Sequence, residues 1–156
     1  MKTIHVTASR EYDVVIGAGL LDECGQRIAA AVPGAEKAVV YTDTTVFPLY
    51  AKRVTDSLKA AGIPYELLGG VQPNPHLGLA REGVKKAIAM DAQLILAIGG
   101  GSVIDTAKAI GMGVPYDGDF WDFFTGKAKI EHTLPIGTVL TISAAGSEGS
   151  DSCVIT

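Results

Sequence analysis

The chain has 156 residues, which is about one domain and is long enough to bury roughly two-thirds of the unfolded surface. Hydrophobic residues make up 47% of it and charged residues only 19%, which excludes a disordered chain and favours a buried sheet. A net charge of -4, without any cluster of Lys and Arg, argues against nucleic acid as a partner.

The cysteines and histidines do not form a recognisable metal or disulfide pattern. Cys24 and Cys153 are far apart, and His5, His76 and His132 are scattered without metal-ligand spacing, so no metal ligand is assigned. The opening residues lead straight into a mixed polar stretch and no run of about 20 apolar residues is present, so we expect no signal peptide and no membrane span. We therefore expect a soluble, cytoplasmic protein without a membrane partner.

The first two-thirds of the chain alternates between predicted strands and helices. We expect strands at 3–8 and 12–17 to form a hairpin around "SREY", followed by a helix at 20–31 that Pro33-Gly34 ends. A strand at 37–43 comes next, and then a helix that Thr44 or Thr45 can cap and that Gly62 ends. The remaining elements are a strand at 64–68, a loop at 69–76, a helix at 77–90, a strand at 93–99 and a helix from Ser102 to Gly111.

After Gly113 the pattern changes to a polar and aromatic excursion, in which residues 121–124 predict a small aromatic cluster. A strand at 133–143 follows, then a tail of small polar residues, and the final "CVIT" looks like a strand. The strands at 39–41 and 94–98 are continuously apolar, as a sheet covered on both faces requires. The sequence thus predicts an α/β fold: a doubly wound, mainly parallel sheet of Rossmann-like topology with an N-terminal β-hairpin.

The candidate ligand site is the glycine run in "LILAIGGGSVIDTAKAIG". Gly99, Gly100 and Gly101 lie between a buried strand and a helix, where glycines let a pyrophosphate approach helix N-terminal amides. Ser102 can cap the helix and donate to phosphate, and Asp105 lies in the expected first turn. The alternative is a tight turn without a ligand, with Asp105 only complementing the helix dipole. By contrast, the G-x-G in "IGAGLLDECG" is followed by Asp22 and is better explained as a turn.

Two further groups of residues are candidates because they end strands, where open parallel sheets bind ligands. Asp43 ends the strand "AVVYTD", and a carboxylate there can accept from both hydroxyls of an adenine ribose and repel a 2′-phosphate. Its alternative role is a helix N-cap. Thr138 and Thr141 lie in the late strand, where hydroxyls could meet a cofactor or simply fill the strand.

Two known families are resembled by different parts of the chain. From Leu68 onward, "GGVQPNPHLGLAREGVKKAIAMDAQLILAIGGGSVIDTAKAIG", "YDGDFWDFF" and "LPIGTVLTISAAGSE" resemble iron-containing, or group III, alcohol dehydrogenases of the butanol dehydrogenase-like branch. The first 65 residues, with "IHVTASREYDVVIGAGLLDECG", resemble the N-terminus of 3-dehydroquinate synthase. The apparent seam at 65–69 indicates either a chimera of two related domains, engineered or otherwise, or a divergent natural member.

The resemblance implies roles for individual positions. It matches Gly99, Gly100, Gly101 and Ser102 to the pyrophosphate loop, and Asp105 to an aspartate towards the nicotinamide. It matches Asp43, with Thr44 beside it, to the ribose-binding strand end, and Thr138 and Thr141 to a cofactor-contacting strand. The resemblance to the butanol dehydrogenase-like branch leads us to expect small residues at the position of Asp43 together with NADP in that branch, so the presence of Asp43 implies NAD rather than NADP here.

Both families carry their iron or zinc ligands in a helical domain that follows the dinucleotide domain, and residues 1–156 contain no counterpart of it. We therefore expect a single NAD(P)-binding domain, inactive as an alcohol dehydrogenase or a synthase by itself, that can self-associate through the uncovered surface. Two alternatives remain: a designed or excised domain without activity, and an alcohol dehydrogenase completed by a separate helical subunit.

Overall fold

The computed structural model describes residues 1–7, 11–71 and 74–156. The expected turn around "SREY" and the middle of the expected loop at 69–76 lie partly outside these ranges. The described strands are β1 (Lys2–Thr7), β2 (Glu11–Ile16), β3 (Ala38–Asp43), β4 (Tyr65–Val71), β5 (Leu94–Gly99) and β6 (Ile136–Leu140). The described helical segments are η1 (Leu20–Glu23), α1 (Cys24–Ala31), η2 (Phe47–Ala51), α2 (Lys52–Ala60), α3 (Leu77–Ala89), α4 (Gly101–Gly113), α5 (Trp121–Phe124) and η3 (Ser147–Gly149).

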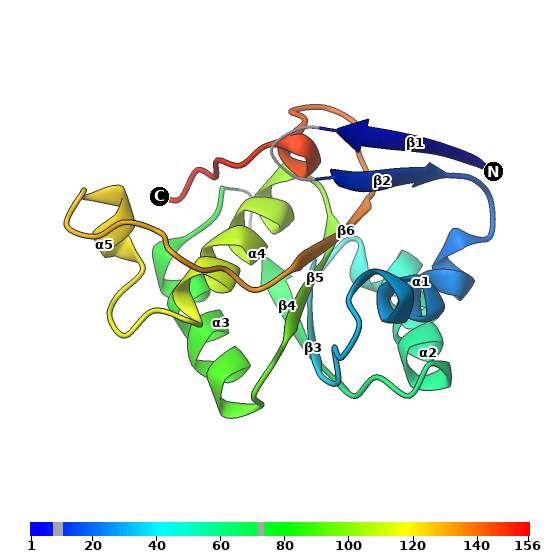
Figure 1. Ribbon diagram of the computed structural model, residues 1–156, viewed down its shortest axis with the longest axis horizontal. Helices are drawn as coiled ribbons and strands as arrows, with labels where there is room; N and C mark the ends of the chain where they lie inside the picture. The colour runs from blue at the N-terminus through cyan, green and yellow to red at the C-terminus, as the bar shows by residue number, and fades with distance from the viewer. Residues whose placement is uncertain (8–10, 72–73) are drawn as a thin grey trace.

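Four of the strands form one parallel sheet in the order β4-β3-β5-β6, so β3 lies between two strands that follow it in the chain. Helices α1 and α2 cover one face of this sheet, and α3 and α4 cover the other (Figure 1). Strands β1 and β2 form a separate antiparallel pair. The prediction of a doubly wound α/β fold with an N-terminal hairpin is confirmed.

The core explains why the central strands are apolar without alternation. In β3, Val40 faces the α1–α2 side together with Leu58, while Val39 and Tyr41 face the α3–α4 side together with Ile104. All of these side chains are almost fully buried. Each face of β3 therefore removes apolar surface from water, which is the main favourable contribution to folding.

Several predicted boundaries are wrong. Strand β4 continues through Gly69 and Gly70 to Val71, with a register shift opposite Tyr41 and Asp43, so the expected loop begins later. The late strand is shorter than expected, because β6 starts only after Pro135, which has no N–H to donate. The expected helix at 20–31 begins as the 3-10 turn η1 before α1.

The sequence "CVIT" predicted a strand at the end of the chain, and this prediction is wrong. The final residues are nevertheless held in place. Ile155 is buried in a cluster with Ala109 and Phe120. The Thr156 N–H donates to the Pro75 carbonyl at 2.8 Å, and the Leu77 N–H donates to the Thr156 carbonyl at 2.9 Å. In place of the expected strand, Thr156 pairs through its backbone with Pro75 and Leu77.

The aromatic cluster is confirmed. The rings of Trp121 and Phe124 stack at 5.1 Å, and those of Tyr116 and Phe123 lie 4.6 Å apart.

Candidate functional site

The carboxyl ends of β3, β5 and β6 lie at one edge of the sheet, where α4 begins directly after β5. The N-cap of α4 is Gly100, with φ -93° and ψ -165°, and its carbonyl accepts from the N–H groups of Val103 and Ile104, each at 3.1 Å. No carbonyl of the described residues accepts from the N–H of Gly101 or Ser102. These two donors are the unpaired amides that a helix N-terminus offers to an anion.

The three glycines of this turn differ in what surrounds them. A Cβ on Gly99 would lie 2.5 Å from Cγ2 of Val103, so Gly99 is needed for packing. A Cβ on Gly100 or Gly101 would meet nothing within 4 Å. The space over Gly100 and Gly101 is therefore open, as the close approach of a phosphate group requires.

Ser102 does not cap α4, contrary to the sequence prediction. The helix begins one residue earlier, at Gly101, because Gly100 adopts the extended N-cap conformation, and no side chain donates or accepts at this cap. Ser102 is the second helical residue and is half-buried, and its carbonyl accepts from the Thr106 hydroxyl at 2.8 Å. Asp105 consequently lies in the second turn, and the expectation that it complements the helix dipole from the first turn is wrong.

Neither Thr44 nor Thr45 caps the next helical segment, since the N-cap of η2 is Val46 and no side chain forms a hydrogen bond at this cap. Asp43 instead closes the turn that precedes η2. Its Oδ1 accepts from the N–H groups of Thr45 at 2.8 Å and Val46 at 2.7 Å, and this turn leads into η2. Thr44 is exposed beside it. The second carboxylate oxygen of Asp43 has no hydrogen-bond partner among the described residues, so one oxygen holds the turn while the other is available.

The threonines near this edge differ in their surroundings. Thr138 lies in β6, pairs with Ala97 of β5 and is exposed. Thr141 follows β6, and its N–H donates to the Gly99 carbonyl at 3.1 Å. Within the described ranges, the hydroxyls of Thr141 and Thr42 are buried without a partner. Thr42, which the sequence analysis did not single out, pairs with Ile98 in the centre of the sheet. A buried hydroxyl without a partner is costly, so both groups suit a bound polar molecule or water.

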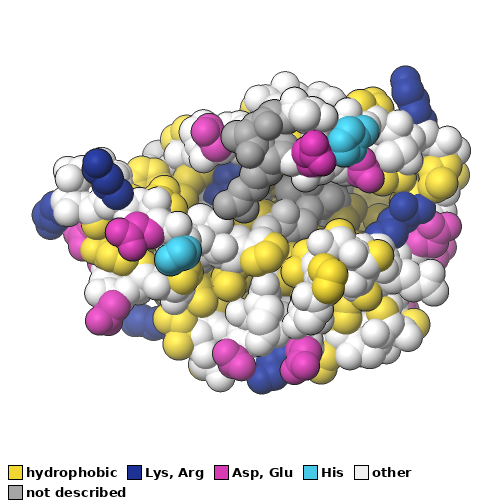
Figure 2. Space-filling view, viewed as in Figure 1, with side chains coloured by type: hydrophobic (Ala, Val, Ile, Leu, Met, Phe, Trp, Pro, Cys, Tyr) yellow, Lys and Arg dark blue, Asp and Glu magenta, His cyan; other side chains and the backbone are white. Residues whose placement is uncertain are grey.

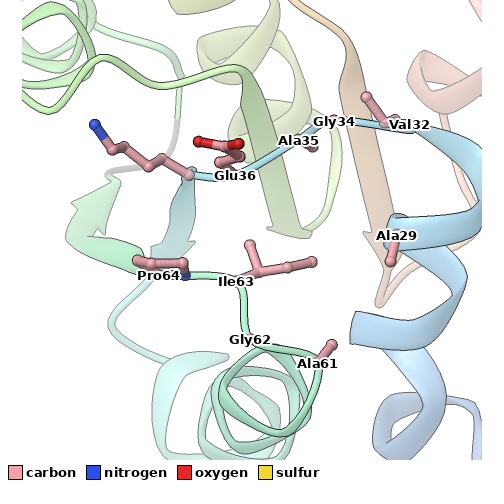
Figure 3. Close-up of a pocket in the computed structure, with 10 residues that line it drawn as sticks. Ala29, Val32, Gly34, Ala35, Glu36, Ala61, Gly62, Ile63 and Pro64 are labelled. Atoms are coloured by element: carbon pink, nitrogen blue, oxygen red, sulfur yellow. The ribbon is translucent and has the colours of Figure 1, made fainter.

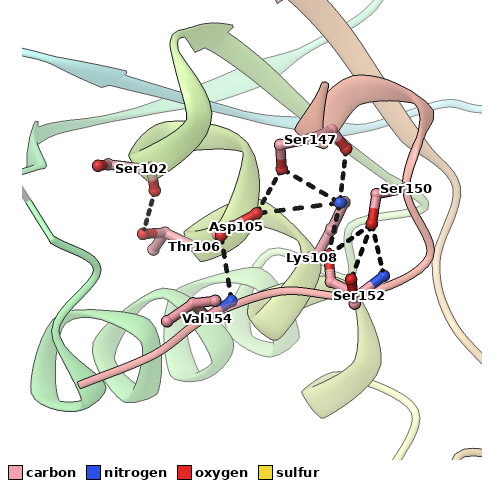
Figure 4. Close-up of polar contacts among 8 residues, drawn as sticks. All are labelled: Ser102, Asp105, Thr106, Lys108, Ser147, Ser150, Ser152 and Val154. Carbon is pink, nitrogen blue, oxygen red and sulfur yellow. Dashed lines mark hydrogen bonds and ion pairs between the residues drawn. The ribbon is translucent and has the colours of Figure 1, made fainter. Parts of the chain in front are cut away.

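Asp105 and Lys108 form a polar cluster with the segment that follows β6 (Figure 4). One oxygen of Asp105 accepts from the Ser147 hydroxyl, and the other accepts from the Val154 N–H at 3.1 Å. The Lys108 ammonium donates to Ser147 and Ser152. Lys108 belongs to the G-G-G-S-x-x-D-x-A-K run, but sequence reasoning assigned it no role, because its partners lie about 40 residues away.

The two-glycine turn before α1 behaves as the simple turn that the sequence favoured. Gly19 has a φ of 82°, and it leads into η1. Asp22 is bound by the Arg53 guanidinium through contacts of 2.9 and 2.5 Å. This pairing holds the pKa of Asp22 below its usual range.

Two cavities in the described part of the chain lie away from the glycine loop. One of about 390 Å³ lies at the opposite, amino edge of the sheet, lined by residues including Ala29, Glu36, Ala61 and Pro64 (Figure 3). Another of about 350 Å³ lies beside α5 and includes Tyr116. On the face drawn in Figure 2 the basic side chains lie singly rather than in one patch. At the glycine loop itself, the space around a Cβ on Gly100 or Gly101 is open.

The model of one family, described as iron-containing alcohol dehydrogenase, matches residues 12–156. The chain belongs to this family. The match runs through the apparent seam at 65–69, so both parts of the chain fit one family.

Individual relatives agree with this assignment. The chain is 49% identical over 104 residues to the probable NADH-dependent butanol dehydrogenase 2 of Bacillus subtilis, covering 67% of the chain and 27% of that protein. It is 39% identical over 144 residues to NADH-dependent butanol dehydrogenase A of Clostridium acetobutylicum, covering 91% of the chain and 36% of that protein. The chain therefore spans about a third of the length of such relatives.

The fold agrees as well. The crystal structure of NADH-dependent butanol dehydrogenase A from Thermotoga maritima matches 83% of the chain and 33% of its own, with a TM-score of 0.79 and 41% identity. In the part of the chain that the structure describes, no helix has both the length and the apolar character needed to cross a membrane.

The family description implies iron, so we asked whether the residues present could hold it. Nowhere in residues 1–7, 11–71 and 74–156 do three or more His, Cys, Asp or Glu side chains gather as a metal would need. These described residues do not fit a metal centre.

Proposed function

We propose that these residues bind a nicotinamide dinucleotide at the carboxyl edge of the sheet, with its pyrophosphate over Gly99, Gly100, Gly101 and Ser102. The observation that carries the proposal is the open first turn of α4. Two amides there find no carbonyl acceptor within residues 1–7, 11–71 and 74–156, and a Cβ on Gly100 or Gly101 would meet nothing within 4 Å. The relatives are named as NADH-dependent butanol dehydrogenases, so the expectation that this branch uses NADP is wrong for them, and their names support NAD(H) as the ligand proposed here.

The remaining site residues follow from their places around this turn. We assign the free carboxylate oxygen of Asp43, with Thr44 beside it, to the hydroxyls of the adenine ribose. The unpartnered hydroxyl of Thr141, next to Gly99, suits a phosphate or ribose oxygen, and Thr138 lies on the same strand. Both oxygens of Asp105 are already occupied by Ser147 and Val154, so we assign it to supporting the site rather than to the nicotinamide.

The proposed cofactor is NAD(H) rather than NADP(H). The Asp43 carboxylate would repel the 2′-phosphate of NADP(H) at the ribose. We do not propose hydride transfer to or from an alcohol for residues 1–156 by themselves. Because the described residues do not fit a metal, the function proposed for this chain is dinucleotide binding without alcohol oxidation.

The test is a titration of the purified chain with NADH, followed by nicotinamide fluorescence, and compared with the Gly100→Val variant. The extended backbone of Gly100 accepts a β-branched residue, and the added methyl groups point into open space, so the fold is expected to persist. The same methyl groups would occupy the phosphate position and abolish saturable binding. Ala30→Val, on the exposed face of α1, adds the same kind of bulk elsewhere and is expected to leave binding unchanged.

Equal NADH affinity in Gly100→Val and the parent chain would refute the proposed site. No binding by the parent chain at millimolar NADH would instead support a domain in which the glycines serve only the turn. Alcohol oxidation by the purified chain, supplied with NAD and metal, would contradict the restriction to binding.

The resemblance of residues 1–65 to 3-dehydroquinate synthase, and with it the chimera, remains a hypothesis. The continuous family match over residues 12–156 supports a single family member instead.

A further inference from the structure

Lys108 is a largely buried cation, with 13% of its side chain exposed. Its Nζ donates to the Ser147 carbonyl at 2.6 Å, to the Ser147 hydroxyl at 3.2 Å and to the Ser152 carbonyl at 2.8 Å. The nearer Asp105 oxygen lies 3.9 Å away. An ammonium has three protons, and three oxygens of the chain receive them. Removing a charge from water is costly without such partners, so the surrounding oxygens are arranged for a cation.

Asp105 completes the cluster from the same helix. Its Oδ1 accepts from the Ser147 hydroxyl, which in turn accepts from Lys108, and its Oδ2 accepts from the Val154 N–H. Figure 4 shows these side chains of α4 turned towards the segment that runs past the helix. Two charged residues of α4 therefore hold residues 147–154.

The segment held in this way continues a loop that begins at the glycine turn. At its start, the Thr141 N–H donates to the Gly99 carbonyl at 3.1 Å. At its end, Ser147 is bound by Asp105 and Lys108. The loop at 142–146, "ISAAG", therefore connects a residue bound to Gly99 with a residue bound to Asp105 and Lys108. Its residues are exposed, and among the described residues no backbone acceptor receives their N–H groups.

We propose that Lys108 is a positioning residue for dinucleotide binding: its ammonium fixes Ser147 and thereby holds loop 142–146 beside the pyrophosphate site. This inference rests on the proposed function. Without the anchor the loop moves freely and has to be ordered when the ligand binds, which costs conformational entropy and lowers affinity.

The first test compares NADH affinity of the parent chain with that of Lys108→Met. Methionine keeps much of the apolar stem and removes all three donors. We expect binding to weaken by about tenfold, and hydrogen exchange of the Val154 amide to become faster. Lys85→Met is the matched control, because Lys85 is exposed on α3 and makes no hydrogen bond or ion pair in the described part of the chain. It is expected to change neither quantity.

The second test distinguishes positioning from a general loss of stability. In Lys108→Ala, added n-propylammonium can refill the space of the missing stem and ammonium, and we expect it to restore NADH affinity. Tetramethylammonium carries the same charge without an N–H donor and should not restore it. Ser147→Ala removes only the hydroxyl and should weaken NADH binding by about threefold, the effect of one weakly contributing hydrogen bond.

Unchanged NADH affinity in Lys108→Met would overturn the inference, as would equal effects of the two ammonium ions on Lys108→Ala. If the parent chain does not bind NADH, the proposed function fails. The exchange measurement then still decides whether Lys108 holds residues 147–154, because it requires no ligand. Unchanged exchange of Val154 in Lys108→Met would show that it does not.

Discussion

Asp43 has two carboxylate oxygens in different surroundings, and only one of them takes part in the turn after β3. The carboxylate caps the turn after β3 through Oδ1, and this leaves Oδ2 for a ligand. The pattern "AVVYTD" could not separate these roles, because a strand-ending aspartate satisfies both. A substitution that keeps the acceptor and removes the charge can separate them.

Asp43→Asn is that substitution, since its amide oxygen can still accept from Thr45 and Val46. We expect thermal stability to stay nearly unchanged and NADPH binding to tighten by about tenfold, because the repulsion of the 2′-phosphate is removed. NADH and NADPH titrations of both proteins give the ratio of affinities. An unchanged ratio would remove Asp43 from the proposed site.

We expect the two cysteines to lower the stability of the fold at alkaline pH. Burial raises the pKa of the Cys24 thiol to about 11, and burial together with the Asp105 carboxylate raises that of Cys153 to about 11. In the unfolded chain the thiols ionise near their ordinary pKa of about 8.5. Their contribution to the free energy of unfolding is therefore complete below that pH and is lost as pH rises to about 11.

Melting temperatures between pH 7 and pH 11 test this expectation. The alkaline loss should be smaller in Cys153→Ala, which removes one of the two thiols, than in the parent chain. Labelling by a thiol reagent at pH 8 should be slow in the folded chain and fast in urea. Fast labelling of the folded chain would show that the thiols are neither buried nor held protonated.

At the scale of elements, the sequence predicted a strand or helix correctly where residues within that element or next to it carry the signal. The continuous apolar runs of β3 and β5 and the stop signal at Gly62 predicted elements that the structure contains. The errors came from distant contacts. Ile155 is held by α4 and Phe120, and Thr156 pairs with residues about 80 positions earlier, so "CVIT" looked like a strand although it forms none.

The same limit applied to the candidate site. The glycine run predicted a turn between strand and helix, and this turn is present. The backbone of Gly100, however, moved the helix start by one residue and so changed the surroundings of Ser102 and Asp105. The partners of Asp105 and Lys108 could not be predicted, because Ser147 and Val154 reach α4 only through the tertiary fold.

The packing of α1 on α2 gives a test at this scale. A Cβ on Gly25 would lie 2.2 Å from the Ser57 carbonyl oxygen, and the Gly25 N–H donates to the Ser57 hydroxyl at 2.9 Å. Gly25→Ala should therefore lower the free energy of unfolding by about 2 kcal/mol, because the cost of overpacking exceeds the gain in helix propensity. Urea unfolding measures it.

Gly78→Ala, in α3, is the matched control for this substitution. Nothing lies within 4 Å of the added Cβ, so it should be neutral or stabilising by up to about 1 kcal/mol. Equal stability of the two variants would contradict the close approach of α1 and α2.

At the scale of the whole molecule, the strand order bears on the hypothesis of a seam at 65–69. Strand β3 precedes the seam, yet it lies between β4 and β5, and it pairs with both along most of its length. The core continues across the same boundary, since Val40 and Leu58 pack with Leu96 and Ile98. The central strand β3 comes from the first part and its two neighbours come from the second, so neither part can form this sheet without the other.

We therefore expect the chain to unfold as one cooperative unit. Trp121 reports on the part after the seam, and the labelling of Cys24 reports on the part before it. Their urea transitions should coincide with each other and with the loss of far-UV circular dichroism. Saturating NADH should shift all three transitions to higher urea by the same amount, because a ligand bound only by the folded chain stabilises the whole unit. Two separate transitions, with only the Trp121 signal shifted by NADH, would show that the parts fold independently and that residues before the seam contribute nothing to the dinucleotide site.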